Sequence, residues 1–353
     1  MARGKPLIGL DIGTSSIKIA LLKDGKKSLE IVGFGRSDLA PETIVDGAIM
    51  NSTAVVEAIQ DAYARARLKT KDVAIGVSGH SVIIKKISLP VMTPDELRES
   101  IQWEAEQYIP FDINDVNLDA QILNQKAGER GQMDVLLVAA KKEMVNDFTQ
   151  VVTEAGLTAV CVDVDAFAIQ NIFERNYEVP SDQTIVLANI GASVVNINVI
   201  ANGVTTFTRD ISIGGNRVTE EIQKQLNVSY EEAETLKVGG ETGGGAEAVV
   251  PEEVERVVST VCEGVASEIQ RSLDFYSATT VDGSIGRLYL SGGTAKVPAL
   301  QKVIEGRTGI PVEVMDPIRG ASFDERVLSH DYMREVGPIS AVALGLGLRR
   351  TIE

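Results

Sequence analysis

The sequence predicts an α/β protein built from two related domains that face each other. Apolar runs of strand length alternate along the chain with segments of helical periodicity. The segment 8–22, IGLDIGTSSIKIALL, has the pattern of a strand, a Gly-Thr-Ser-Ser turn and a second strand that returns beside the first. The same order of strand, glycine turn and strand recurs at 184–199, TIVLANIGASVVNINV.

The two segments also match in their spacing. Fourteen positions separate Asp11 from the hairpin glycine Gly25, and fourteen separate Asn189 from Gly203. The repeat lies 178 positions further on, from 11 to 189, which is about half of the 353-residue chain. A chance glycine turn does not recur with its hairpin at the same offset. We therefore infer an internal duplication.

Composition excludes several classes of protein. A chain of 353 residues can form two domains with separate cores. The net charge of −16 argues against a nucleic-acid partner. Cys161 and Cys262 lack metal-ligand spacing, so we expect no zinc site or disulfide, and a reducing cytoplasm fits best. No run of eighteen apolar residues occurs, so we expect no transmembrane helix.

Helical periodicity places the main helices between these strands. We expect them at 53–68, 94–105, 142–155, 166–176, 251–279, 297–308 and 337–348. Ser52 or Thr53 is expected to cap the first of them. Gly345 and Gly347 in the last one indicate close packing against a neighbour. The glycine-rich segment 239–248 has no lysine followed by Ser or Thr, so it reads as a surface loop and not as a P-loop.

Three glycine-centred turns follow strands and could hold phosphate groups. Consecutive backbone amides in such turns form an anion-binding concavity, and glycine allows close approach of the ligand. Asp11 precedes the first turn and Asn189 precedes the second. The turn residues are Gly13, Thr14, Ser15 and Ser16, then Gly191, Ala192 and Ser193, and finally Gly292, Gly293 and Thr294.

This ordered set of turns, with the helices 166–176 and 337–348, resembles the nucleotide site of the actin-like ATPase superfamily across the whole chain. The resemblance implies an actin-like fold, a duplicated ribonuclease H-like arrangement of two domains. In that family the first two turns hold the phosphates of ATP or ADP, and the third contacts the adenosine. It also implies a Mg²⁺ ion that Asp11 would hold through water.

Two further features resemble the FtsA and PilM families within that superfamily. The segment 211–220, ISIGGNRVTE, carries Gly214 and Gly215 and is followed by AETLK at 233–237. In those families the Glu and Lys of the second segment help bind ribose and adenine, which here implies Glu234 and Lys237. The string EAEQYIPF at 104–111 resembles the PilM family of type IV pilus assembly in particular.

The expected domain division follows the same resemblance. The first core would comprise 1–80, 157–178 and 337–353, and the inserted subdomain would comprise 81–156. The second core would comprise 179–215 with 280–336, and its outer subdomain 216–279.

The resemblance to the PilM family implies a scaffold on the cytoplasmic side of the inner membrane. Such proteins bind ATP, hold the N-terminal cytoplasmic peptide of PilN, and link the membrane platform to the pilus motor. The insertion would supply the peptide surface, with these residues as candidates: Trp103, Tyr108, Ile109, Pro110 and Phe111. For Trp103 the sequence favours the alternative of a core position in the small subdomain.

Hydrolysis is less well supported than binding. Asn189 stands where the superfamily usually has Asp, and an amide neither offsets metal charge nor accepts a proton. Asp163 or Asp165 could substitute in part as a catalytic acid, or could simply cap the following helix. Lys18 could face the β-phosphate or be solvated. We therefore expect nucleotide binding with slow or absent turnover.

Two other functions remain as alternatives. A small-molecule kinase of the same superfamily would need an aspartate base and a second-substrate motif, and no such motif is evident. A cytoplasmic domain like that of GspL in type II secretion would be expected to continue into a membrane-spanning segment. Self-association and contacts with other pilus components are left open.

Overall fold

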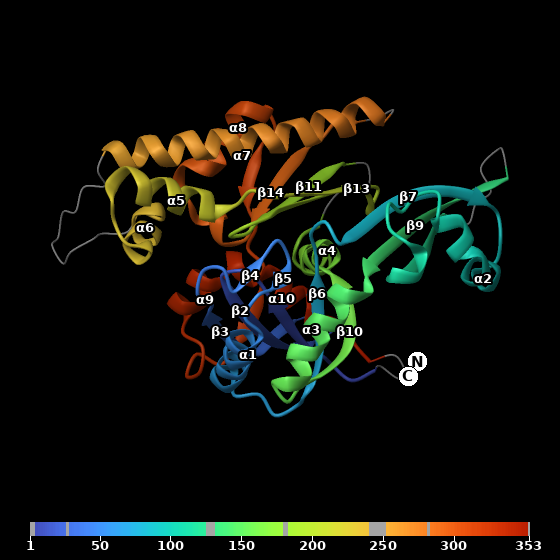
Figure 1. The fold of residues 1–353 in the computed structure, drawn as a ribbon, viewed down its shortest axis with the longest axis horizontal. Coiled ribbons are helices and arrows are strands. Elements are labelled where there is room, and N and C mark those ends of the chain that lie inside the picture. The colour runs from blue at the N-terminus through green and yellow to red at the C-terminus, as the bar shows by residue number, and fades with distance from the viewer. Residues whose placement is uncertain are drawn as a thin grey trace.

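The computed structural model describes residues 4–25, 28–124, 131–178, 183–239, 252–280 and 283–351. Two β-sheets with helices on their faces form the body of the molecule, and a smaller sheet projects from one side (Figure 1). The long helix α7 (Glu252–Thr279) crosses the outside of the upper sheet, and α1 (Ser52–Ala66) lies below the lower one. The chain is therefore an α/β protein, as predicted.

The first sheet has six strands in the order β10-β6-β1-β2-β3-β16. They are β1 (Ile8–Ile12), β2 (Ser16–Asp24), β3 (Leu29–Asp38), β6 (Asp72–Val77), β10 (Thr158–Val164) and β16 (Ala321–Phe323). Apolar residues of α1 and α3 (Lys142–Glu154) fill one face of it. Those of α4 (Asp165–Asn176) and α10 (Ala341–Leu346) fill the other.

The second sheet repeats this plan with five strands in the order β13-β12-β11-β14-β15. They are β11 (Ile185–Ile190), β12 (Val195–Ala201), β13 (Val204–Ile211), β14 (Arg287–Ser291) and β15 (Val312–Val314). β11, β12 and β13 form an antiparallel meander, as β1, β2 and β3 do, and β14 runs parallel to β11 as β6 runs parallel to β1. The inferred duplication is thus visible in the topology.

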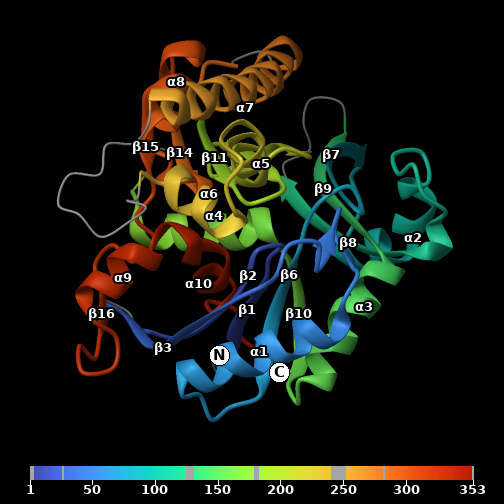
Figure 2. The same cartoon turned by 60° about the vertical axis from the view of Figure 1, so that its left-hand side comes forward.

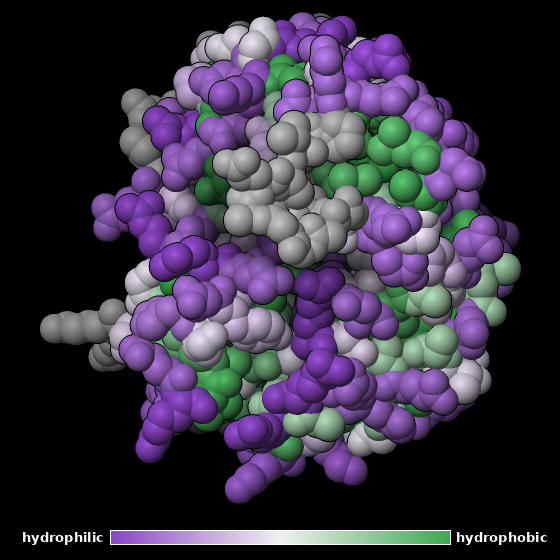
Figure 3. Space-filling view, turned by 90° about the vertical axis from the view of Figure 1, so that its left-hand side faces the viewer, coloured by the Kyte–Doolittle hydropathy of each residue, from purple (hydrophilic) through white to green (hydrophobic). Residues whose placement is uncertain are grey.

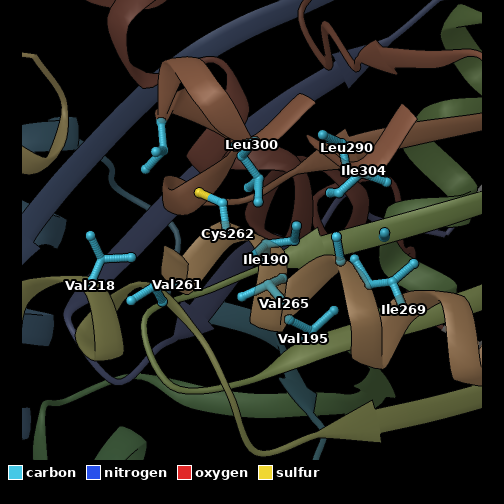
Figure 4. Close-up of a cluster of buried hydrophobic side chains, with 14 of the residues drawn as sticks. Ile190, Val195, Val218, Val261, Cys262, Val265, Ile269, Leu290, Leu300 and Ile304 are labelled. Carbon is cyan, nitrogen blue, oxygen red and sulfur yellow. The ribbon is translucent and has the colours of Figure 1, made fainter. Parts of the chain in front are cut away.

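The outer face of the second sheet carries the apolar core of that domain. Helix α7 and helix α8 (Pro298–Thr308) pack there with α5 (Gly215–Leu226). Figure 4 shows the side chain of Cys262 among those of Val265, Leu300 and Ile304. Burial raises the pKa of the Cys262 thiol to about 11, so this cysteine is a packing residue.

The insertion is a three-stranded antiparallel sheet with one helix on one face. Its strands are β7 (Val82–Pro90), β8 (Val116–Asn124) and β9 (Gln132–Lys141), in the order β7-β9-β8. Helix α2 (Pro94–Ala105) begins at a capping box in which Thr93 and Glu96 bond reciprocally. Leu97, Ile101 and Ala105 of this helix pack on the sheet.

The remaining elements connect these layers. They are β4 (Ile44–Val45), β5 (Ala48–Ile49), α6 (Tyr230–Lys237), α9 (His330–Val336) and the 3₁₀ turns η1 (Ile113–Asp115), η2 (Gly293–Lys296) and η3 (Pro338–Ser340). No helix in the described ranges is both long and apolar enough to cross a membrane.

Two local features differ from the sequence expectations, and a third expectation falls largely outside the described residues. Asn51, and neither Ser52 nor Thr53, caps α1, because its side chain accepts a hydrogen bond from the amide of Ala54 at 3.1 Å. β16 pairs with β3 in the first sheet, although the range 280–336 was expected in the second core. All but the first residue of the glycine-rich segment 239–248 lies outside the described residues.

The C-terminal segment shows why its glycines are needed. The expected helix 337–348 is a 3₁₀ turn followed by the short helix α10. A Cβ atom on Gly345 would collide with the carbonyl oxygen of Ala168 in α4. The close helix contact expected for Gly345 is therefore present, between the two helices that lie under the cleft.

Candidate functional site

A cleft of about 370 Å³ lies between the two sheets and collects most of the predicted site residues. On the face shown in Figure 3, hydrophilic side chains gather along the seam between the upper and lower halves of the molecule. Asp11 and Asp165 line the cleft. So do Gly13, Thr14, Ser15, Ser16, Lys18, Asn189, Gly191, Ala192, Ser193, Glu234, Lys237, Gly292, Gly293 and Thr294.

The first and second glycine turns touch each other at this cleft. The Oγ atom of Ser193 donates to the Oγ1 atom of Thr14 at 3.2 Å, and the side-chain Nδ2 of Asn216 donates to the same Ser193 oxygen at 3.2 Å. The third turn joins them, because Thr294 Oγ1 donates to the carbonyl of Gly191 at 2.8 Å. Residues of all three turns thus meet around one cleft.

Gly214 and Gly215 do not line the cleft, although the resemblance implied that they do. They lie behind the second turn, where the amide of Gly215 donates to the carbonyl of Gly191 at 3.0 Å. A Cβ atom on Gly214 would come within 2.5 Å of the carbonyl oxygen of Ala192. Their small size lets α5 begin directly against the second turn, so they brace it.

A row of charged side chains crosses the first sheet at the cleft. Asp11, Lys18 and Arg36 are direct cross-strand neighbours on β1, β2 and β3. Lys18 Nζ lies 3.2 Å from the carboxylate of Asp11, and both side chains are largely buried. Lys18 is therefore not solvated. Arg36 pairs with Asp38 at 2.6 Å, while its buried Nε has no hydrogen-bond partner within the described residues.

The second sheet carries the corresponding row with different chemistry. Asn189, Asn196 and Asp210 are cross-strand neighbours on β11, β12 and β13, and Ser291 on β14 lies on the other side of Asn189. Ser291 donates to Asn189 at 3.2 Å, Asn189 donates to Asn196 at 3.2 Å, and Asn196 donates to Asp210 at 2.8 Å. The acid of this row is thus on β13 and not in the turn.

Sequence reasoning missed Asn196 and Asp210. A usable signal was present, because both residues lie seven positions from the hairpin glycine Gly203 and so face each other across that hairpin. The hairpin glycine Gly203 marks the duplication, and the same hairpin also pairs Asn196 with Asp210.

Asp165 is the buried acid of the cleft. Burial, followed by the nearby Asp11 carboxylate, raises the pKa of Asp165 from 3.8 to about 7, against a hydrogen bond with Ser78 that lowers it. Asp163 differs, since its side chain pairs with Arg349 at 2.5 Å outside the cleft. Neither acid caps α4, which has no side-chain cap. Asp165 can therefore exchange a proton near neutral pH.

Helix α6 brings a second buried polar cluster to the cleft. Lys237 is only 7% exposed, donates to Thr219 Oγ1 at 3.1 Å and pairs with Glu234. Thr219 donates to the same carboxylate of Glu234. Tyr230 begins this helix and also lines the cleft, and burial raises the pKa of its phenol. The cluster presents donors and acceptors at one end of the cleft.

The insertion corrects two expectations. Trp103 is 74% exposed, so the expected core position is wrong; α2 buries Leu97, Ile101 and Ala105, and Trp103 faces away from them. Ile109 is 6% exposed and belongs to the core of the insertion, so it is not free to contact a partner.

The other three candidate residues on the insertion differ in exposure. Pro110 is exposed, while Tyr108 and Phe111 are half-buried at the margin of the insertion core. Lys141 Nζ lies 4.5 Å from the centre of the Phe111 ring. Lys85 Nζ donates to the carbonyl of Tyr108 at 3.0 Å.

Comparison with known proteins now decides the family. A family model described as type IV pilus assembly protein PilM matches residues 9–351. The chain belongs to the PilM family. A solved PilM–PilN type IV pilus biogenesis complex contains a chain 26% identical to it, with a TM-score of 0.86 and 99% of each chain covered.

Two other similarities place the PilM-family chain among actin-like proteins. The cell division protein FtsA of Streptococcus pneumoniae is 24% identical over 98% of this chain and 84% of its own length. The ethanolamine utilization protein EutJ of Carboxydothermus hydrogenoformans has the same fold, with a TM-score of 0.58, 17% identity, and 98% and 92% of the two chains covered. The predicted actin-like fold is confirmed. Membership of the PilM family also favours a function in pilus assembly over the two alternatives, a small-molecule kinase and a GspL-like domain.

Proposed function

We propose that this protein is a nucleotide-binding scaffold of type IV pilus assembly. It holds ATP or ADP in the cleft between its two domains and a PilN-type peptide on its insertion. The contact between the first two glycine turns, Ser193 Oγ to Thr14 Oγ1 at 3.2 Å, carries the nucleotide part of this proposal. Two phosphate-binding turns that meet can grip one polyphosphate from both domains.

Each part of the nucleotide has a matching set of groups. Backbone amides of the turns would donate hydrogen bonds to the phosphate oxygens, and Lys18 adds a positive charge beside Asp11. Glu234 and Lys237 offer an acceptor and a donor for the ribose and the base at the other end of the cleft. Gly293 and Thr294 also line the cleft and would contact the adenosine.

The acids of the cleft suit Mg²⁺, which prefers oxygen ligands and retains several waters. Asp11 and Asp165 both line the cleft, and after burial the Asp11 carboxylate is the next cause of the raised pKa of Asp165. A cation between the acids and the phosphates would relieve that repulsion. Asp11 would hold the ion through water, and the ion would neutralise phosphate charge.

Hydrolysis is slow or absent in this account. Asn189 places an amide where an acid would normally help orient water and metal, and its own hydrogen bonds are made to Asn196 and Ser291. Asp165 is the candidate acid to accept a proton from water, because its pKa is raised to about 7. Turnover of tens per second that is abolished in Asp11→Ala would contradict slow hydrolysis.

Nucleotide binding has a direct stability test. A ligand at one hundred times its dissociation constant stabilises the folded chain by about 2.7 kcal/mol. We expect Mg-ATP to raise Tm at such concentrations. An unchanged Tm across millimolar Mg-ATP would remove the proposed nucleotide site.

The peptide surface is proposed at the insertion and the strand edge beside it. β10 is an edge strand, since β6 is its only partner among the described strands, and Val160 and Val162 on it are 45% and 40% exposed. β10 and α3 lie below the base of the insertion in Figure 1. An extended peptide can add backbone hydrogen bonds to such an edge and place apolar side chains on the valines.

Trp103 and Pro110 supply exposed apolar groups on the insertion itself. Tyr108 and Phe111 at the margin of its core can complete that wall. Binding there would keep this protein at the inner face of the inner membrane through PilN.

Calorimetric titration with the N-terminal cytoplasmic peptide of PilN from the same organism tests the partner. We expect Val160→Glu and Trp103→Ala each to weaken binding about tenfold or more. Phe275→Ala is the matched control, because Phe275 is a 56% exposed aromatic residue on α7, outside both the insertion and β10. Equal affinity in all three variants would place the peptide elsewhere, and no binding to the wild type would remove this part of the proposal.

A further inference from the structure

The loop at 78–81 holds both connections between the first domain and the insertion. It follows β6 and leads directly into β7. The amide of Val82 donates to the carbonyl of Gly79 at 3.0 Å, and the amide of Lys141 donates to the carbonyl of Ser81 at 3.0 Å. Val82 opens the insertion sheet and Lys141 closes it. A movement of this loop therefore moves the base of the whole insertion.

The second domain grips the same loop from across the cleft. One carboxylate oxygen of Asp210 accepts a hydrogen bond from the amide of Gly79 at 2.5 Å. A second hydrogen bond joins His80 Nε2 and Ser212 Oγ at 2.8 Å. Asp210 is in β13 and Ser212 follows it, so the end of one strand of the second sheet holds the loop at two adjacent residues.

The other oxygen of Asp210 leads back to the nucleotide cleft. It accepts from Asn196, which accepts from Asn189, which accepts from Ser291, at 2.8, 3.2 and 3.2 Å. Each amide in this chain donates in one direction only. A ligand group that bonds to Asn189 would polarise or compete with these hydrogen bonds, and the change would pass along the row to Asp210.

Asp210 also lines the cleft together with the two acids Asp11 and Asp165. Asp165 lies close enough to both Asp11 and Asp210 that each of these carboxylates raises its pKa. A bound nucleotide and cation would change the balance of charge around Asp210 directly. Hydrogen bonding and electrostatics therefore both connect the cleft to the loop.

We propose that Asp210–Gly79 and Ser212–His80 form an interdomain latch through which nucleotide in the cleft sets the affinity of the insertion for its peptide. The latch is this set of four residues. The inference rests on the proposed function, since it requires both ligands. Asp210 acts as a positioning residue: it holds the loop, and the loop holds the insertion.

The experiment measures coupling and not binding alone. The PilN peptide is titrated calorimetrically into the wild type, into the double variant His80→Ala with Ser212→Ala, and into Asp210→Ala. Each titration is run without nucleotide and with saturating Mg-AMPPNP. His330→Ala is the matched control, because His330 is the other histidine of the chain and bonds to Glu325 far from the loop.

We expect the peptide dissociation constant of the wild type and of His330→Ala to differ at least fivefold between the two nucleotide conditions. In the latch variants the two peptide dissociation constants, without and with Mg-AMPPNP, should differ by less than twofold. Hydrogen exchange of segments 78–90 and 132–141 should respond to Mg-AMPPNP in the wild type and not in the latch variants.

Two results would overturn the latch while leaving the proposed function intact. One is a wild type that binds both ligands with a peptide affinity independent of nucleotide. The other is a pair of latch variants that keep the wild-type ratio. Failure of the wild type to bind either ligand alone would instead overturn the proposed function, and the latch with it.

Discussion

Replacing Asp165 by asparagine should stabilise the protein, and by more at high pH. The pKa of this buried carboxyl is about 7 in the folded chain against 3.8 for a free side chain. A folded-state pKa raised above the unfolded value means that the group favours folding at low pH and that this advantage is lost as pH rises towards 7. Since each pH unit of difference is worth about 1.4 kcal/mol, ionised Asp165 costs about 4 kcal/mol above pH 7.

Asp165→Asn removes that cost, because the amide has nearly the same shape and no charge. We expect the free energy of unfolding of Asp165→Asn to exceed that of the wild type by up to about 4 kcal/mol at pH 8. At pH 5 the difference should shrink to about 2 kcal/mol, since the wild-type carboxyl is then mostly protonated in the folded state.

Urea denaturation at pH 5 and pH 8, without nucleotide or divalent metal, measures both values. Asp147→Asn is the control, because Asp147 is exposed on α3. A wild type and an Asp165→Asn variant whose stability difference does not change with pH would refute the reasoning, and so would a variant that is less stable at pH 8.

Three further outcomes are expected. Gly345→Ala should lower stability by about 2 kcal/mol, because the added methyl group meets the backbone of Ala168, whereas Gly264→Ala, with open space around its Cβ in α7, should be neutral or stabilising in thermal unfolding. Asn189→Asp should raise ATP turnover at least about tenfold in a phosphate-release assay by restoring an acid to the second turn, and an unchanged rate would contradict the role given to Asn189. The Cys262 thiol should react with a thiol reagent at pH 8 only after unfolding, because its pKa is about 11 in the folded protein, and rapid labelling of the folded chain at this residue would be inconsistent with its burial.

The cleft could be predicted from the sequence because each of its glycine turns is encoded by a short continuous segment. A strand, a glycine turn and a returning strand are specified within fifteen residues, and the repeat at 184–199 showed that two such turns exist. The fold then brings them together by pairing each copy into its own sheet. The spacing of apolar residues likewise predicted helix α4, which packs against both sheets.

Contacts between segments that are far apart in the sequence could not be predicted in this way. Gly79 and Asp210 are 131 residues apart, and nothing in either local pattern indicates their hydrogen bond. β16 illustrates the same point, since three residues near the C-terminus join an edge strand close to the N-terminus. Such pairings depend on how the two domains and their connections pack.

Trp103 shows a different kind of error. Tryptophan is usually buried, so the sequence favoured a core position. The spacing of Leu97, Ile101 and Ala105 defines one face of α2, and Trp103 does not lie on it. Periodicity within the helix was the better guide than residue type. The exposed side chain also makes Trp103 a better candidate for the partner surface than Ile109.

The central claim is that the two glycine turns form one nucleotide clamp, and calorimetric titration with Mg-ATP tests it most directly. Thr14→Glu places a carboxylate in the turn that meets Ser193, and Thr70→Glu makes the same charge change at an exposed loop. The account predicts one Mg-ATP per chain for the wild type and Thr70→Glu, and loss of binding in Thr14→Glu. Equal binding by all three proteins, or none by the wild type, would contradict it.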